Sequence, residues 1–224
     1  MDDLNLVVLP YIQAMTEGPV EIKDVACSSG ISTQEWYDAL IAAGIETRMI
    51  GTDLSTEALH LPGKFADILL DKYLHVIHLS LMGGAVHPRI LKALRVSGLC
   101  LLVRLYVALG AVPIPMRLVS KAVRNIEIVD GDIENREDNY DRSFHVIRAA
   151  NILNLAYFGP DRLRRIVSNL LLGLRDGGLL VVCRTHGDGS NHATVFRYQA
   201  SRLEILERLG RGSEIEGLLS YLST

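Results

Sequence analysis

Residues 20–53 read VEIKDVACSSGISTQEWYDALIAAGIETRMIGTD and alternate between two short apolar segments and one segment with helical periodicity. The segment Ile22–Cys27 has the pattern of a buried strand, and the small residues 28–30 predict a turn after it. Ser32 and Glu35 have the spacing of a capping box, so we expect a helix to begin here. A second strand is predicted over Arg48–Thr52. This order of strand, helix and strand is typical of a parallel sheet covered by helices.

Strand patterns return after residue 125. A helix is expected to begin at Pro160, because the first turn of a helix tolerates proline. Only the eight residues 185–192 then separate two predicted strands, whereas a parallel crossover needs about a dozen or more. We therefore expect an antiparallel hairpin there, at the edge of a Rossmann-like, mostly parallel α/β sheet. The predicted strands of this part are Ile126–Val129, Phe144–Arg148, Leu179–Arg184, Ala193–Tyr198 and Leu203–Arg208.

Residues 62–124 interrupt this alternation. Glycine and proline breaks divide them into segments that we interpret as helices, and Ser55 is placed to cap a short helix just before them. The sequence thus predicts three regions: the first part of an α/β domain over 1–61, a helical insertion over 62–124, and the second part of the α/β domain over 125–224.

The composition is that of an ordinary globular protein. Of 224 residues, 49% are hydrophobic and 22% are charged, which excludes intrinsic disorder and collagen-like or low-complexity chains. Cys27, Cys100 and Cys183 form no C-x-x-C pair, so we expect neither a disulfide framework nor a cysteine-based zinc site. The N-terminus lacks the basic region of a secretory signal. These features predict a cytoplasmic protein in a reducing compartment.

The charges are unevenly distributed. Within residues 72–126 there is no Asp or Glu, and the apolar run 96–116 carries a single charge, Arg104. This combination predicts peripheral contact with a membrane or another anionic surface through residues 72–126, by an interfacial helix with basic flanks. The alternative is a packing layer whose cations pair with acidic patches of the same chain. The eight basic residues of this region are Lys72, Arg89, Lys92, Arg95, Arg104, Arg117, Lys121 and Arg124.

Polar residues follow the predicted strands at their carboxyl ends, where open parallel sheets bind ligands. Asp53 closes the second strand, Asp132 follows the third and Asn151 follows the fourth. An acid at the first position can accept both hydroxyls of a ribose, and an acid at the second can accept an adenine amino group. The small residues after the first strand let a ligand approach the backbone N–H groups at a helix N-terminus.

These segments resemble class I S-adenosylmethionine-dependent methyltransferases, and among them the chemotaxis-receptor type. The resemblance covers residues 20–60 and 125–210, but not the insertion. The glycine-rich turn of that family is reduced here to Gly30, and His145 stands where an Asp is usual. About 20 residues precede the first strand, which leaves no room for the helical receptor-binding domain of that family. The matching segments are Val20–Gly30, Gly51–Ser55, Gly131–Ile133, Phe144–Asn151 and Leu174–Leu180.

The resemblance implies a binding site for S-adenosylmethionine, whose parts are assigned residue by residue. Asp53 would take the ribose hydroxyls, with Leu54 beside the adenine. Asp132 and Ile133 would hold the adenine, and Asn151 would lie near the sulfonium. The residues implied around the methionine part are Asp24, Ala26, Ser28 and Gly30.

The densest polar cluster of the chain is THGDGSNH, residues 185–192, after the fifth strand. Histidine is a common general base, so His186 and His192 are candidate catalytic residues together with Asn151. The alternative is a polar hairpin loop with two solvated histidines. The spacing does not suit a metal site, because no third ligand is evident.

The predicted function is methyl transfer from S-adenosylmethionine to a small-molecule or lipid-like acceptor, with the insertion as acceptor site or lid. One alternative is methylation of a protein carboxylate. Another is a non-catalytic module that docks partners through the basic insertion. Nucleic acid is disfavoured as a partner, because aromatic residues are only 6% and the cations are interleaved with aliphatic residues.

Overall fold

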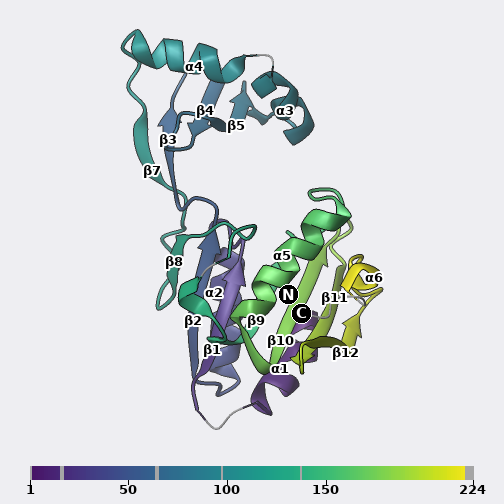
Figure 1. The fold of residues 1–224 in the computed structure, drawn as a ribbon. Helices are drawn as coiled ribbons and strands as arrows, with labels where there is room; N and C mark the ends of the chain where they lie inside the picture. The colour runs from purple at the N-terminus through teal and green to yellow at the C-terminus, as the bar shows by residue number, and fades with distance from the viewer. Residues whose placement is uncertain (1, 16–17, 64–65, 97, 137, 220–224) are drawn as a thin grey trace. The chain divides into compact units, whose positions relative to one another are not determined.

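The computed structural model describes residues 2–15, 18–63, 66–96, 98–136 and 138–219. It divides the chain into two compact units, each with its own sheet. Unit 1 comprises Met1–Leu54 and Ser120–Thr224, and unit 2 comprises Ser55–Val119. Figure 1 shows both units, with unit 2 inserted in the chain between β2 and β8 of unit 1.

Unit 1 is built on a seven-stranded sheet in the order β12-β11-β10-β9-β1-β2-β8 (Figure 1). The five strands from β10 to β8 run parallel, and β11 and β12 extend one edge in antiparallel fashion. Strand β1, the middle one of the five parallel strands, is buried over nearly its whole length, as expected for a parallel strand with helices on both faces. The strands are β1 Val20–Val25, β2 Thr47–Asp53, β8 Glu127–Asp130, β9 Phe144–Ala150, β10 Leu174–Thr185, β11 Asn191–Gln199 and β12 Arg202–Leu209.

Helices cover both faces of this sheet. On one face, α1 and α2 bury apolar side chains that include Val8 and Trp36 against the sheet. On the other face, α5 and α6 pack with side chains such as Leu163 and Leu219. Pro160 occupies the first turn of α5, as predicted. Unit 1 is therefore a Rossmann-like α/β fold, which confirms the predicted class. Its helices are α1 Asp2–Gln13, α2 Ile31–Ala42, the short 3₁₀ helix η1 Asp138–Tyr140, α5 Pro160–Gly173 and α6 Glu216–Leu219.

The predicted hairpin is confirmed. β10 and β11 pair in antiparallel register from Thr185 and Asn191 down to Gly178 and Tyr198, with no helix between them. The predicted capping box at Ser32 is wrong. Helix α2 begins after Gly30, whose φ of 76° lies in the left-handed region, and no side chain caps the helix. The tight turn after β1 places this glycine, rather than a hydroxyl, at the helix end.

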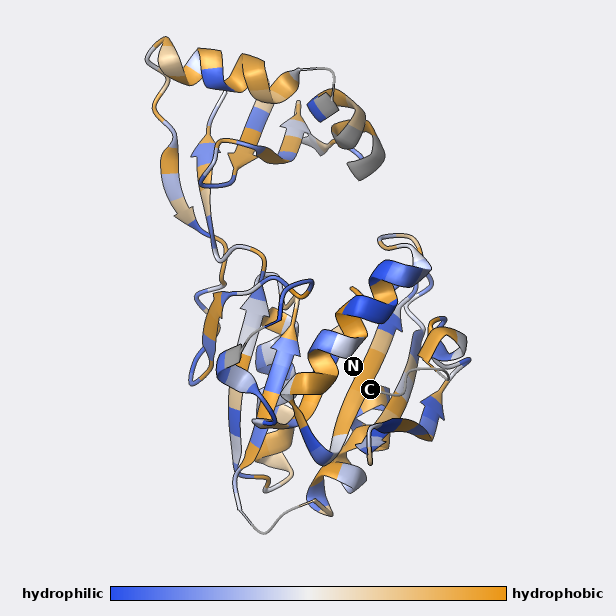
Figure 2. Cartoon of the chain, in the orientation of Figure 1, coloured by the Kyte–Doolittle hydropathy of each residue, from blue (hydrophilic) through white to orange (hydrophobic). Residues whose placement is uncertain are grey.

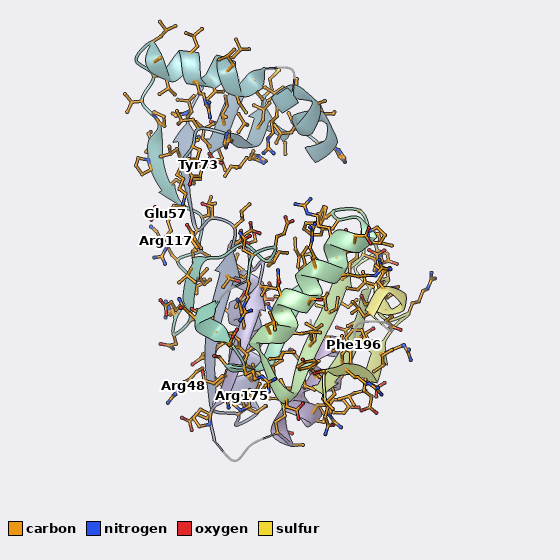
Figure 3. All side chains as sticks on the ribbon, viewed as in Figure 1. Arg48, Glu57, Tyr73, Arg117, Arg175 and Phe196 are labelled. Atoms are coloured by element: carbon orange, nitrogen blue, oxygen red, sulfur yellow. The ribbon has the colours of Figure 1, made fainter. Side chains whose placement is uncertain are left out.

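Unit 2 corrects the predicted insertion, because it is not purely helical. It contains a five-stranded antiparallel sheet in the order β6-β5-β4-β3-β7, with two helices, and it spans 55–119 rather than 62–124. Each strand depends on a partner elsewhere in the chain. Glu57 on β3, for example, stands opposite Arg117 on β7 (Figure 3). The elements are β3 Glu57–Leu61, β4 Ala66–Leu70, β5 Val76–Leu81, β6 Gly84–Ala85, α3 Pro88–Val96, α4 Leu99–Ala108 and β7 Ile114–Arg117.

The segment around Ser55 shows why the predicted helix does not form. The Oγ of Ser55 donates to the carbonyl of Glu57 at 2.6 Å, and the chain continues directly into β3. Unit 2 has a core of its own, in which Leu70 and Val76 are fully buried with Val103 of α4. No helix in the described ranges has both the length and the apolar character needed to cross a membrane.

Candidate functional site

The carboxyl ends of β1, β2, β8 and β9 meet at one edge of the sheet of unit 1. The segments that follow them surround a cavity of about 390 Å³. Five residues predicted to bind a cofactor, Ala26, Asp53, Leu54, Asp132 and Ile133, lie in its wall. We call this space the strand-end cavity. The remaining residues in its wall are Gly131, Glu134, Ile152, Phe158 and Arg162.

The two aspartates of the strand-end cavity accept hydrogen bonds from backbone N–H groups. Asp53 Oδ2 accepts a hydrogen bond from the N–H of Ser28 at 2.7 Å. Asp132 Oδ1 accepts from the N–H of Glu134 at 3.0 Å, and its Oδ2 accepts from the side chain of Asn135 at 3.1 Å. Each carboxylate retains lone pairs for further donors. Ser28 therefore orients an acid of the cavity without lying in the cavity wall itself.

Apolar side chains share the cavity wall with these aspartates. Leu54, Ile133, Ile152 and Phe158 contribute this surface, and Leu54 is 72% exposed. Arg162 stacks over the ring of Phe158, with Cζ 5.0 Å from the ring centroid, and its Nε donates to Glu134 Oε2 at 2.5 Å. The hydrogen bond from Arg162 lowers the pKa of Glu134. The cavity wall thus combines apolar side chains with carboxylate acceptors.

The turn after β1 has an unusual backbone. Ala26 and Ser28 have φ values of 55° and 54°, and Gly30 follows at 76°, so all three are left-handed. Side chains disfavour this region, which explains why glycines are common at these positions in the family that the sequence resembles. A Cβ on Gly30 would lie 2.4 Å from Ile128 Cδ1 and 2.8 Å from Val123 Cγ2. Gly30 is therefore required for packing, and the structure does not place it in the cavity wall.

Asp24, predicted to lie near the methionine part of the cofactor, is used inside the protein instead. It is 1% exposed, and its Oδ1 accepts from Arg148 Nε at 2.8 Å. Its Oδ2 accepts from Arg148 Nη2 at 2.5 Å and from Thr33 Oγ1 at 2.6 Å. The structure therefore does not bring Asp24 into the wall of the strand-end cavity, and the guanidinium of Arg148 occupies its carboxylate.

The buried cysteine of the same turn, Cys27, has a thiol of low reactivity. Burial raises the pKa of the Cys27 thiol to about 12, and the nearby carboxylates of Asp24 and Asp53 add to this effect. A thiol with this pKa is protonated at neutral pH and is a poor nucleophile. Cysteine chemistry at this edge of the sheet is thereby disfavoured.

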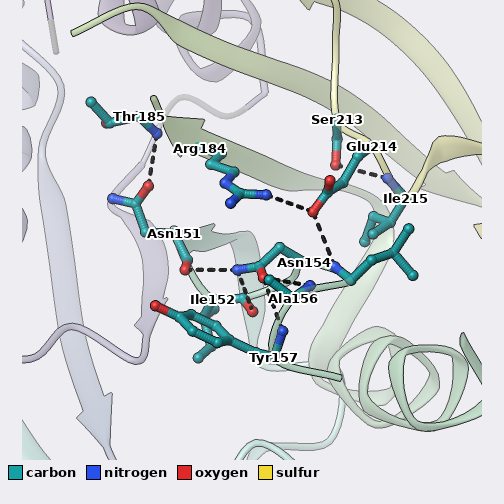
Figure 4. A network of polar contacts seen from close by, with 11 residues as sticks. Asn151, Ile152, Asn154, Ala156, Tyr157, Arg184, Thr185, Ser213, Glu214 and Ile215 are labelled. Carbon is teal, nitrogen blue, oxygen red and sulfur yellow. Dashed lines mark hydrogen bonds and ion pairs between the residues drawn. The ribbon is translucent and has the colours of Figure 1, made fainter. Parts of the chain in front are cut away.

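The structure places the predicted catalytic residues in two separate locations. His186 and His192 lie side by side, with ring centroids 4.3 Å apart, in the wall of a second cavity of about 240 Å³. We call it the histidine cavity. Asn151 is not in its wall. It accepts from the N–H of Thr185 at 2.7 Å through Oδ1 and has a φ of 62° (Figure 4). The other residues of the histidine cavity are Leu153, Val182, Cys183, Arg184, Arg211, Gly212, Ser213 and Glu214.

One loop, residues 151–158, contributes to both cavities. Ile152 and Phe158 line the strand-end cavity, and Leu153 lines the histidine cavity. Asn154, which is 3% exposed, holds the loop together: its Oδ1 accepts from the N–H groups of Ala156 and Tyr157, both at 3.1 Å (Figure 4). Both cavities therefore share one loop, whose backbone is held by the amide of Asn154.

The residues of the C-terminal loop that line the histidine cavity were not identified from the sequence. Glu214 accepts from Arg184 Nη1 at 2.8 Å and from the N–H of Leu155 at 3.0 Å, which ties the C-terminal loop to loop 151–158 (Figure 4). A Cβ on Gly210 would lie 2.5 Å from His192 Cδ2. The two glycines in GRGSE, residues 210–214, are the feature of the sequence that indicates a sharply folded loop here. Within the described part of the chain, no group of three or more His, Cys, Asp or Glu side chains is placed to hold a metal ion.

Comparisons with known proteins add a limited finding. No protein-family model and no curated protein matches this sequence. Among solved structures, the CMeT domain of the citrinin polyketide synthase is 16% identical over 75% of this chain and 29% of its own length, with a TM-score of 0.39. The carbon methyltransferase CurJ is 15% identical over 84% of this chain and 36% of its own, with a TM-score of 0.43.

A third similar structure is an S-adenosylmethionine-dependent methyltransferase from Methanosarcina mazei, which is 17% identical over 78% of this chain and 56% of its own, with a TM-score of 0.39. This chain spans about a third of the length of the first two proteins. These structural neighbours are methyltransferases by name. The assignment of the Rossmann-like fold rests on the strand order of unit 1.

Proposed function

We propose that this chain is an S-adenosylmethionine-dependent methyltransferase that binds the cofactor in the strand-end cavity. The observation that supports this proposal is that Asp53 and Asp132 share one cavity wall with apolar side chains, at the carboxyl ends of the neighbouring parallel strands β2 and β8. A cavity of about 390 Å³ is within the range of small-molecule and cofactor sites.

The chemistry of these residues fits the cofactor. The Asp53 carboxylate would accept from the ribose hydroxyls, and Asp132 would accept from the adenine amino group. The side chains of Leu54, Ile133 and Phe158 would cover the adenine ring. The backbone around Ala26 would face the methionine part. The cofactor, when bound, supplies a methyl group that is activated by the sulfonium.

The protein must orient the acceptor and, where the accepting atom carries a proton, remove that proton. His186 and His192 are suited to this role because both line the histidine cavity and imidazole is a common general base. We therefore propose that the acceptor lies in the histidine cavity and that an imidazole accepts its proton. The apolar contribution of Leu153 and Val182, with a volume of about 240 Å³, favours a small or lipid-like acceptor.

Calorimetry with S-adenosylmethionine tests the cofactor assignment. Asp53→Ala should weaken binding roughly 10- to 150-fold, because charge-assisted hydrogen bonds to the ribose are lost. Glu204→Ala, which removes an exposed acid on β12, is the matched control and should bind like the wild type. Wild-type affinity in Asp53→Ala would overturn the placement of the cofactor, and no binding by the wild type would overturn the proposed function.

Two other functions remain alternatives to a small acceptor. Methylation of a protein carboxylate is the reaction of the chemotaxis-receptor type that the motifs resemble. A non-catalytic module that docks partners is favoured by the exposed apolar surface of unit 2, described below. Transfer of a radiolabelled methyl group into small molecules, lipids or protein from a cell extract separates these alternatives. Label in protein alone would support the first alternative, and cofactor binding without any transfer would support the second.

A further inference from the structure

Helix α4 of unit 2 exposes an unusually large apolar surface. The side chains of Leu101, Leu102, Leu105 and Tyr106, and of the C-cap residue Leu109, are 72%, 64%, 55%, 57% and 78% exposed. Figure 2 shows that α4 is hydrophobic along most of its length, including the side that faces away from the sheet of unit 2. We call these five residues the α4 face. Contiguous exposed apolar patches of this kind mark interaction sites on proteins.

The α4 face is distinct from the core of unit 2. Val103 is 4% exposed and packs with Leu70 and Val76 of the sheet, with Val107 packed against the same cluster. At 3.6 residues per turn, the α4 face occupies an arc of about 140° on the other side of the helix. The packing of unit 2 therefore uses one side of α4 and leaves a continuous apolar stripe unused.

The unit that carries the α4 face is positively charged. Unit 2 has seven basic and three acidic residues, so its formal net charge is +4. Two of its acids contact histidines, since Asp67 lies 3.2 Å from His60 and Asp71 lies 2.9 Å from His75. The side chains of Arg89 and Lys92 lie outside the described part. Exposed cations of unit 2 with described side chains are Lys72, Arg95, Arg104 and Arg117.

One cation lies at the border of the α4 face. On a helical projection Arg104 is about 60° from Leu101. Its guanidinium donates through Nη2 to the carbonyl of Tyr73 at 3.1 Å, which fixes it on the unit 2 side of the stripe. A charged head beside an apolar stripe is the arrangement by which Arg and Lys reach lipid head groups while their stems stay in apolar surroundings.

We infer that the α4 face docks onto an anionic lipid surface. The ten residues of α4 are about 15 Å long, half the thickness of a bilayer core of about 30 Å, so the helix lies along the interface. Leu101, Leu105 and Leu109 enter the acyl boundary, and Tyr106 sits at head-group level. The cations of unit 2 select anionic head groups. This inference goes beyond the proposed methyl transfer and is independent of it.

Vesicle co-sedimentation of the full chain tests the inference. At low salt the protein should bind vesicles of phosphatidylcholine with phosphatidylglycerol more strongly than vesicles of phosphatidylcholine alone, and binding should fall as salt rises. The triple variant Leu101→Ser, Leu105→Ser, Leu109→Ser should bind at least tenfold more weakly. The control variant Leu6→Ser, Ile31→Ser, Ile41→Ser changes exposed apolar residues of unit 1 and should bind like the wild type.

A second variant tests the contribution of the cations of unit 2 to vesicle binding. Lys72→Glu with Arg95→Glu should abolish the preference for phosphatidylglycerol. Circular dichroism and thermal unfolding establish that each variant is folded. The inference is overturned when the wild type ignores both vesicles, or when the triple variant binds as well as the wild type. Concentration-dependent dimerisation that the triple variant loses, without any vesicle binding, would also overturn it and would identify a second copy of the chain as the occupant.

Discussion

Arg148 and Asp24, which are 124 residues apart in the sequence, form a buried ion pair between the neighbouring strands β9 and β1. Their side chains are 0% and 1% exposed, and the guanidinium also lies over the ring of Trp36 at 4.3 Å. Burial opposes the charge on Arg148, but the carboxylate of Asp24 outweighs this effect and keeps the pKa of the guanidinium above its usual value. Each charge is therefore tolerable only because the other is present.

Removal of either partner should destabilise unit 1 strongly. Arg148→Met and Asp24→Leu should each lower the free energy of unfolding by about 3–5 kcal/mol, because each leaves an uncompensated buried charge. The double variant should lose much less than the sum of the two, as measured by urea unfolding. Additive losses would contradict the coupling. Asp24→Asn, which preserves volume, is the milder variant, and its folded fraction should keep wild-type affinity for S-adenosylmethionine.

The left-handed backbone at Ala26 can be relieved by glycine. Ala26→Gly should raise the free energy of unfolding by up to about 1 kcal/mol. The strain of an alanine at φ 55° is larger than the additional backbone entropy that a glycine loses when the chain folds. Ala39→Gly, in the middle of α2, is the matched control and should lower it by about 1 kcal/mol. Thermal or urea unfolding measures both. A destabilised Ala26→Gly would show that the turn adopts another conformation in solution.

Loop 151–158 should depend on the amide of Asn154. Asn154→Ala should cost about 1–3 kcal/mol, because two backbone N–H groups lose their buried acceptor. Since Ile152 and Phe158 of this loop line the strand-end cavity, cofactor affinity should fall as well. Asn154→Asp keeps the acceptor and should recover part of both losses. Equal affinity in all three proteins would show that the loop is dispensable for the cavity.

His145 should make stability depend on pH. Its Nδ1 accepts from the N–H of Glu21 at 2.9 Å, and Arg175 lies close to Nε2, near the amino-terminal end of β10 (Figure 3). Burial, together with the charge of Arg175, lowers the pKa of His145. The unfolded chain therefore binds the proton more readily, so the contribution of this residue is present above about pH 6.5 and is lost as pH falls below it.

The variant His145→Gln isolates this effect, because it keeps an acceptor that does not titrate. The decrease in the free energy of unfolding between roughly pH 7.5 and pH 5.5 should be smaller in His145→Gln than in the wild type. Urea titrations at the two pH values provide the comparison. Equal decreases in the two proteins would place the pH dependence at other groups.

Local sequence patterns determined the architecture of unit 1. The strands and helix of residues 20–53 are visible as short apolar runs and a helical period, and each of those signals comes from neighbouring residues. The antiparallel pairing of β10 and β11 followed from chain length alone, because eight residues are too few for a parallel crossover. Asp53 and Asp132 could be expected at one edge because parallel strands end on the same side of a sheet.

Only the tertiary structure decided where partners from distant parts of the chain meet. The strands of unit 2 read as helices because a strand such as Glu57–Leu61 is stabilised by pairing with Ile114–Arg117, more than 50 residues away. Nothing near Asp24 in the sequence reveals that Arg148 pairs with its carboxylate. Backbone periodicity is a local property, whereas strand pairing and the compensation of a buried charge depend on contacts that form only when the chain folds.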